Sequence, residues 1–186
     1  MMKKIAAIKR LLKNIHAESR GITFIELMVA MGIFIGVAAA IFAILSGGRR
    51  AWLTSEAQID VQSELRHALI AMTGELGLAG PGTVFIVNVS AAEDRIIFQT
   101  PSGFAGGAVT WGSQIQFSLG GNNGHQLMRT DITTGQTESL ANYITALHFS
   151  QPAADLVQIA MAGERQAVSG NTPSMQITTQ VALRNR

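Results

Sequence analysis

The feature that most constrains this chain is one long apolar run near its start. Residues 22–45 read ITFIELMVAMGIFIGVAAAIFAIL and contain a single charged side chain, Glu26. About twenty apolar residues are enough for a helix to cross the hydrocarbon core of a bilayer, so the run predicts a transmembrane helix. A secretory signal would be followed by a small-residue cleavage site and a polar stretch. After Leu45 the chain instead continues SGGRRAW, so we expect the helix to be retained.

Charge is divided unevenly on the two sides of Gly21. The first 21 residues carry six Lys and Arg and one acid, whereas the rest carries eight Arg, no Lys and eleven acids, a net −3. Because basic residues favour the cytoplasmic side, the first segment is predicted to lie in the cytoplasm and the remainder outside. Arg49 and Arg50 flank the helix on the other side, but the six basic residues of the first segment outnumber them. The arginines form no dense basic face, so no nucleic-acid partner is expected.

Glu26 is the anomaly within the apolar run. An ionised carboxylate in a membrane helix costs about 2.5–3.5 kcal/mol on insertion scales when it lies near the bilayer centre. Two interpretations fit its position four residues into the run. The side chain reaches water at the interface, as charges near helix ends commonly do, or it meets a cationic partner within the membrane. Position alone does not separate them.

The residues around Glu26 resemble a known signature. The stretch RGITFIELMVA is similar to the processing and assembly motif of type IV pilins and type II secretion pseudopilins. In those families a basic leader ends in Gly, an apolar residue follows, and Glu is the fifth residue of the mature chain. Mapped here, Gly21 precedes the cut, Ile22 becomes the mature N-terminus, and Glu26 is the fifth residue. The family usually begins with Phe or Met, so Ile22 is a departure.

The resemblance implies specific processing and assembly steps. A prepilin peptidase in the inner membrane would cut between Gly21 and Ile22 from the cytoplasmic side and methylate the new amine of Ile22. Glu26 would then pair with the N-terminal ammonium of a neighbouring major or minor pilin or pseudopilin, which sets axial register during filament assembly. The chain would be a single-pass inner-membrane protein with a periplasmic C-terminal domain, and then part of a pilus or pseudopilus.

Gly32 and Gly36 give a G-x-x-x-G spacing within the same run. Such a pair permits close helix packing, and we keep both residues as candidates for contacts in a filament core. Glycine is also simply frequent in membrane helices, so the spacing leaves that alternative open.

Beyond Gly48 the pattern becomes that of an amphipathic helix over residues 46–77. Apolar residues recur along one face at helical spacing, and Gly77, Gly80 and Pro81 end the pattern. The apolar face comprises Val61, Leu65, Ala68, Leu69, Met72 and Leu76, and the polar face comprises Gln58, Asp60, Gln62, Ser63, Glu64 and Arg66.

Residues 78–186 predict a β-rich domain. Alternating apolar and polar residues indicate half-buried strands, clearest at Gln114–Leu119, and the loop GGNNG predicts a hairpin to the next strand. Expected strands cover residues 84–89, 95–100, 114–119, 126–131, 144–150, 156–161 and 175–184. One helix followed by a run of strands predicts an α+β fold, a long N-terminal helix packed on an antiparallel sheet, as the pilin resemblance also implies. The four segments are thus a leader (1–21), a membrane or filament-core helix (22–45), an amphipathic helix (46–77) and a β domain (78–186).

The motifs of catalysis and cofactor binding are missing from the sequence. It has no cysteine, no paired histidines at metal-binding spacing and no phosphate or dinucleotide fingerprint, so we expect no enzyme activity, metal or cofactor. His16, His67, His125 and His148 are interpreted as surface or singly hydrogen-bonded residues. The loop before Asp131 has too few carboxylates for a calcium site, and Gly103, Gly106 and Gly107 are interpreted as a loop.

The leading hypothesis is a minor pilin of a type IV pilus. Short stretches such as QSELRHALIAMTGELGLAG and VALRN resemble W-type minor pilins and J-type pseudopilins. Ala43, where major pilins tend to have Pro, and the lack of a C-terminal disulfide both favour a minor subunit. A minor pseudopilin of a type II secretion system is the nearest alternative. A more distant one is a static, membrane-tethered periplasmic binding domain or enzyme, which predicts an uncut leader and indifference to changes at Glu26.

Overall fold

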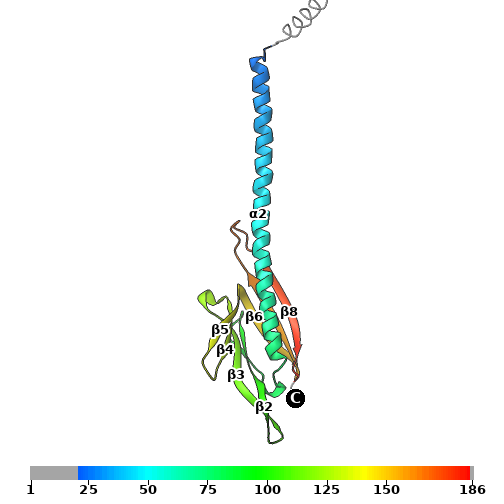
Figure 1. Cartoon of the computed structure of the whole chain (residues 1–186), viewed down its shortest axis with the longest axis vertical. Coiled ribbons are helices and arrows are strands. Elements are labelled where there is room, and N and C mark those ends of the chain that lie inside the picture. Colours follow the sequence, from blue (N-terminus) through cyan, green and yellow to red (C-terminus); the bar gives the residue numbers. More distant parts are fainter. Residues whose placement is uncertain (1–20, 185–186) are drawn as a thin grey trace, which may run out of the picture. The chain divides into compact units, whose positions relative to one another are not determined.

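The computed structural model describes residues 21–184. The chain divides into two units between Gly48 and Arg49, and each is described by itself. The predicted leader lies outside the described residues except for Gly21. The elements are α2 (Phe24–Leu76), two 3-10 turns, η2 (Pro81–Thr83) and η3 (Asn122–Gly124), and eight strands: β1 (Phe85–Asn88), β2 (Asp94–Ala105), β3 (Ala108–Gly120), β4 (Gln126–Asp131), β5 (Thr137–Asn142), β6 (Ile144–Ala153), β7 (Leu156–Glu164) and β8 (Ser174–Ala182) (Figure 1).

The first unit contains the apolar part of α2. Every residue from Gly21 to Leu45 is exposed in the isolated chain, and the helix is long and apolar enough to cross a membrane. The helix is uninterrupted at Gly47 and Gly48. The membrane boundaries expected at residues 22 and 45 stay a prediction, because composition and length alone carry them.

The second unit contains the remainder of α2 and all eight strands. Five antiparallel strands form one sheet in the order β1-β2-β3-β4-β5, and three form another in the order β6-β7-β8. The fold is therefore α+β with the helix packed on antiparallel sheet, as the sequence predicts, although the sheet is divided in two. This architecture is compatible with a pilin-like fold.

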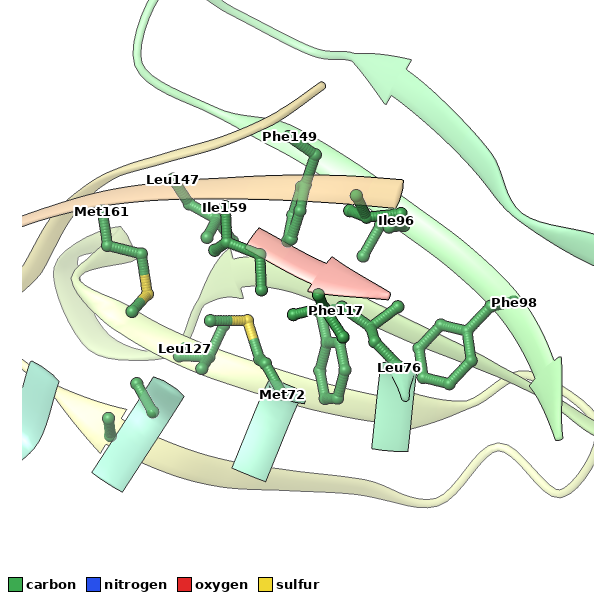
Figure 2. Packing of buried hydrophobic residues seen from close by; sticks show 14 of the residues in the cluster. Met72, Leu76, Ile96, Phe98, Phe117, Leu127, Leu147, Phe149, Ile159 and Met161 are labelled. Carbon is green, nitrogen blue, oxygen red and sulfur yellow. The ribbon is translucent and has the colours of Figure 1, made fainter. Parts of the chain in front are cut away.

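The core lies between the apolar face of α2 and the inner faces of both sheets. Figure 2 shows Met72 and Leu76 of α2 pointing toward Phe117 and Leu127 of the larger sheet and Ile159 of the smaller one. The predicted helix face is confirmed, since all its residues are buried except Leu69, which is partly buried; Ala57 joins it. Phe98 and Phe117 add a tilted ring contact with centroids 5.4 Å apart.

Several local predictions were wrong. Gly103, predicted to lie in a loop, is inside β2, whereas Gly106 and Gly107 form the turn of the long β2–β3 hairpin, as the loop prediction requires. Strand β5 was missed. Glu64, predicted to face solvent, instead accepts a 2.6 Å hydrogen bond from the backbone N–H of Asn142 in β5, so it ties the helix to that sheet.

Candidate functional site

The candidate site is the start of α2, where Thr23 and Glu26 bind each other. The first helical residue is Phe24, so Thr23 occupies the N-cap and Glu26 the third helical position. The backbone N–H of Glu26 donates to Oγ1 of Thr23 at 3.3 Å, and the N–H of Thr23 donates to Oε2 of Glu26 at 2.9 Å. These reciprocal bonds form a capping box, which satisfies two N–H groups that a helix start leaves without partners.

A third bond draws Glu26 closer to the cap. The Thr23 hydroxyl donates to the same Oε2 atom at 2.9 Å. The carboxylate therefore folds back over the first turn, where the helix dipole favours negative charge. Thr23 was not among the predicted site residues. The signal was present, because T-x-x-E directly before an apolar run is the pattern of a capping box.

The predicted cleavage point lies just ahead of this cap. Residues 21–23 have no regular secondary structure and are exposed, so the bond between Gly21 and Ile22 is in a non-helical segment adjoining the helix. A Cβ atom at Gly21 would meet no atom within 4 Å. Packing against the described residues therefore does not require glycine here.

Gly32 and Gly36 lie one turn apart on α2, nine and thirteen residues beyond Thr23. Both are exposed, and a Cβ atom at either would meet nothing within 4 Å. The described chain thus brings no second helix against them, and their predicted packing role stays a prediction about other subunits.

Two of the remaining polar candidates, His148 and Asp131, have structural partners in the second unit. His148 Nδ1 lies 3.2 Å from Oδ2 of Asp94, and that oxygen also accepts the N–H of Phe149 at 3.1 Å, so the buried carboxylate links β2 to β6. Asp131 caps the β4–β5 turn through Oδ1, which accepts the N–H groups of Thr133 and Thr134. Within residues 21–184, no group of three or more His, Asp or Glu residues gathers as a metal site.

Comparisons with known proteins gave no relative: no family model, no curated protein and no solved structure matches this chain. The family resemblance therefore rests on sequence motifs, chiefly residues 20–30, and on a fold that is compatible with it.

Proposed function

We propose that this chain is a minor pilin: a subunit of a type IV pilus that prepilin peptidase processes between Gly21 and Ile22 and that enters the filament through Glu26. The observation that carries the proposal is the position of Glu26, a carboxylate fixed on the first turn of a helix that is otherwise apolar over residues 22–45.

The capping geometry is unaffected by the proposed cleavage. Cutting after Gly21 leaves the amide between Ile22 and Thr23 intact, so the Thr23 N–H and hydroxyl still bind Oε2 of Glu26. The new ammonium is carried by Ile22, next to the cap. A mature subunit thus presents a carboxylate and an ammonium close together at one helix end.

Charge pairing between subunits would resolve an energetic conflict at this end. Each of the two charges is costly in an apolar medium, and a neighbour's opposite charge offsets the cost only when it approaches closely. A neighbouring helix staggered along the filament axis brings its own ammonium to Glu26. The pairing therefore sets axial register, while the apolar side chains supply most of the contact area.

The same features would serve a minor pseudopilin of a type II secretion system. Both machines use an apolar N-terminal helix, and nothing in the β domain separates them. Deleting the chain from its host distinguishes the two, because loss of surface pili supports the pilus and loss of exoprotein secretion supports the pseudopilus.

The mature N-terminus is the first test. Mass spectrometry of the protein from membranes should find N-methyl-Ile22 as the first residue, and Gly21→Ala should leave the precursor uncut. An N-terminus at Met1, or one beyond Leu45, would overturn the proposal in favour of a static tethered or secreted domain.

A second test separates the charge of Glu26 from its role in the cap. Gln can replace Glu in a capping box, so Glu26→Gln keeps the helix start but removes the charge. We expect Glu26→Gln to be processed normally and to enter filaments at least tenfold less than wild type. Thr23→Ser, which keeps the cap, is the matched control and should assemble. Normal assembly of Glu26→Gln would refute charge pairing.

A further inference from the structure

The part of α2 that belongs to the second unit buries one face against the strands and leaves an apolar stripe on the opposite face. Trp52, Ile59 and Ile70 are 74%, 64% and 63% exposed. At about 100° per residue, the three side chains leave the helix within about 20° of one another. Single exposed apolar residues are ordinary, whereas large ones aligned on one helix face indicate a surface that binds another molecule.

The stripe has the spacing of a coiled-coil seam. Its members follow one another at alternating steps of three and four residues, which is the a/d spacing of a heptad repeat. A seam of this kind packs against a second α-helix, so the shape of the surface indicates a helix as its occupant. All members of the stripe are exposed: Arg49, Trp52, Glu56, Ile59, Ser63, Arg66 and Ile70.

A hollow of about 240 Å³ opens on this stripe. It is lined by Trp52, Ser55, Glu56, Ile59 and Asp60. The first four stand at i, i+3, i+4 and i+7, the corners of the hole that receives one side chain of a facing helix in knobs-into-holes packing. An indole ring beside a carboxylate attracts a cation. A guanidinium suits it best, because it can stack on the ring and bond to the acid at once.

The chain carries a matching cation one heptad before the hollow. Arg49 is exposed and lies on the same stripe, seven residues before Glu56. Within residues 21–184, neither the Arg49 guanidinium nor the Glu56 carboxylate has an ion pair, whereas Asp60, the other acid of the hollow, pairs with Arg165. The cation of the stripe and one acid of the hollow are therefore both available to another molecule.

The charges of the stripe select one register between two such helices. If copies enter one filament from one membrane, as the proposed function on which this inference rests requires, their helices run parallel. An unshifted pair would place Arg49, Glu56 and Arg66 opposite themselves, and like charges in contact are unfavourable. A shift of one heptad, about 10 Å, keeps the stripe facing the stripe. It brings Arg49 of one copy to Glu56 of the other, and Trp52 to Ile59.

We propose that the hollow between Trp52 and Ile59 receives Arg49 of a second copy of this chain, whose α2 lies parallel and is displaced by one heptad. The guanidinium stacks on the indole ring and pairs with the Glu56 carboxylate. The shifted contact is heterologous, so each copy keeps a free hollow on one side and a free Arg49 on the other. Such a contact repeats into an open filament instead of closing as a dimer.

Disulfide crosslinking tests the register. The chain has no cysteine, so engineered cysteines report this contact alone. Ser63→Cys in one tagged copy and Ile70→Cys in a second, co-expressed copy lie on the stripe outside the hollow, seven residues apart. In filaments sheared from cells and oxidised, a 63–70 disulfide is expected to exceed the 63–63 and 70–70 products about fivefold or more, because cysteines about 10 Å out of step do not bridge.

Charge variants test the hollow in the same crosslinking assay. Arg49→Ala should lower the 63–70 product about fivefold. Arg66→Ala is the matched control, since it removes another exposed arginine of the stripe that does not enter the hollow, and it should leave the product unchanged. Arg49→Glu or Glu56→Arg alone should abolish the product, and the two together should restore it, a rescue that a purely structural role would not give.

Each remaining outcome counts against the inference. Mainly 63–63 or 70–70 disulfides would show unshifted helices. An equal or larger loss with Arg66→Ala than with Arg49→Ala, or no rescue by the double reversal, would remove Arg49 from the hollow. Filaments that contain the chain without the 63–70 product would overturn this inference alone. Absence of the chain from filaments would overturn the proposed function, and this inference with it.

Discussion

Gly163 of β7 packs tightly against Val61 and Leu65 of α2, and replacing it tests this packing directly. An added Cβ atom would lie 2.8 Å from the carbonyl oxygen of Tyr143, 3.3 Å from Cγ1 of Val61 and 3.5 Å from Cγ of Leu65. The Tyr143 oxygen cannot move easily, because it accepts the N–H of Glu164 at 2.9 Å. Tyr143 also has a φ of 62°, a conformation that restricts backbone adjustment further.

The magnitude follows from two opposing effects. Inserting a methyl group into a tightly packed site costs about 1–3 kcal/mol. Gly→Ala also reduces the conformational entropy of the unfolded chain, which stabilises the folded state by about 0.4–1 kcal/mol. From the middle of each range, Gly163→Ala should lower the free energy of unfolding by about 1.3 kcal/mol, which corresponds to a fall in Tm of roughly 3–7 °C for a domain of this size.

The assay is thermal unfolding of the full-length chain in detergent, followed by tryptophan fluorescence. Trp111 reports on the second unit because its ring packs against Gly80. The matched control is Gly74→Ala, where an added Cβ atom meets nothing within 4 Å; it should raise stability by about 0.5–1 kcal/mol, since glycine is unfavourable inside a helix. An unchanged or higher Tm for Gly163→Ala, with the control behaving as expected, would refute the close approach.

Two further predictions concern carboxylates in the second unit. Asp94→Ala should lower the free energy of unfolding by about 1–3 kcal/mol, because the buried N–H of Phe149 loses its acceptor. Asp94→Asn keeps an acceptor oxygen and should lower it by less. Equal Tm values for the two variants in thermal unfolding would contradict this. Hydrogen bonds from the N–H groups of Thr134 and Thr133 hold the pKa of Asp131 below its ordinary value, so its carboxylate stabilises the fold above about pH 4 and loses this effect as the pH falls through the lowered pKa. The Tm difference between wild type and Asp131→Ala should accordingly narrow on acidification, and a constant difference from pH 7 to pH 2 would contradict the assignment.

The helix and most strands could be predicted because their side chains carry a periodic signal. Val61, Leu65 and Met72 recur at helical spacing and are buried, and the hairpin after Leu119 forms where GGNNG predicts it. Strand β5 has little alternation in TESLAN and forms because β4 offers it an edge. The outer β2–β3 hairpin has the glycine and proline content of a loop, and its pairing outweighs that local preference.

The contacts of individual polar residues depend on neighbours that are distant in sequence. Asp94 and His148 are in contact because β2 and β6 lie next to each other. Glu64 accepts a hydrogen bond from Asn142 instead of facing solvent. Neither contact has a local signal. The Thr23–Glu26 cap, by contrast, could have been predicted, because its residues are three positions apart and follow the T-x-x-E pattern of a capping box.

The two parts of α2 pose different problems of burial. From Arg49 onward, strands of the same unit bury the apolar face of the helix. From Ile22 to Leu45, fifteen large apolar side chains are exposed, and burying them is worth on the order of 20–40 kcal/mol. That is large beside the roughly 5–15 kcal/mol by which domains are stable, and the helix is long and apolar enough to cross a membrane. Lipid is a favourable environment for all fifteen apolar side chains but an unfavourable one for the carboxylate of Glu26. Under the proposed function, a bundle of helices that also provides an ammonium would suit the apolar side chains and Glu26 alike, and that difference would favour transfer from bilayer to filament.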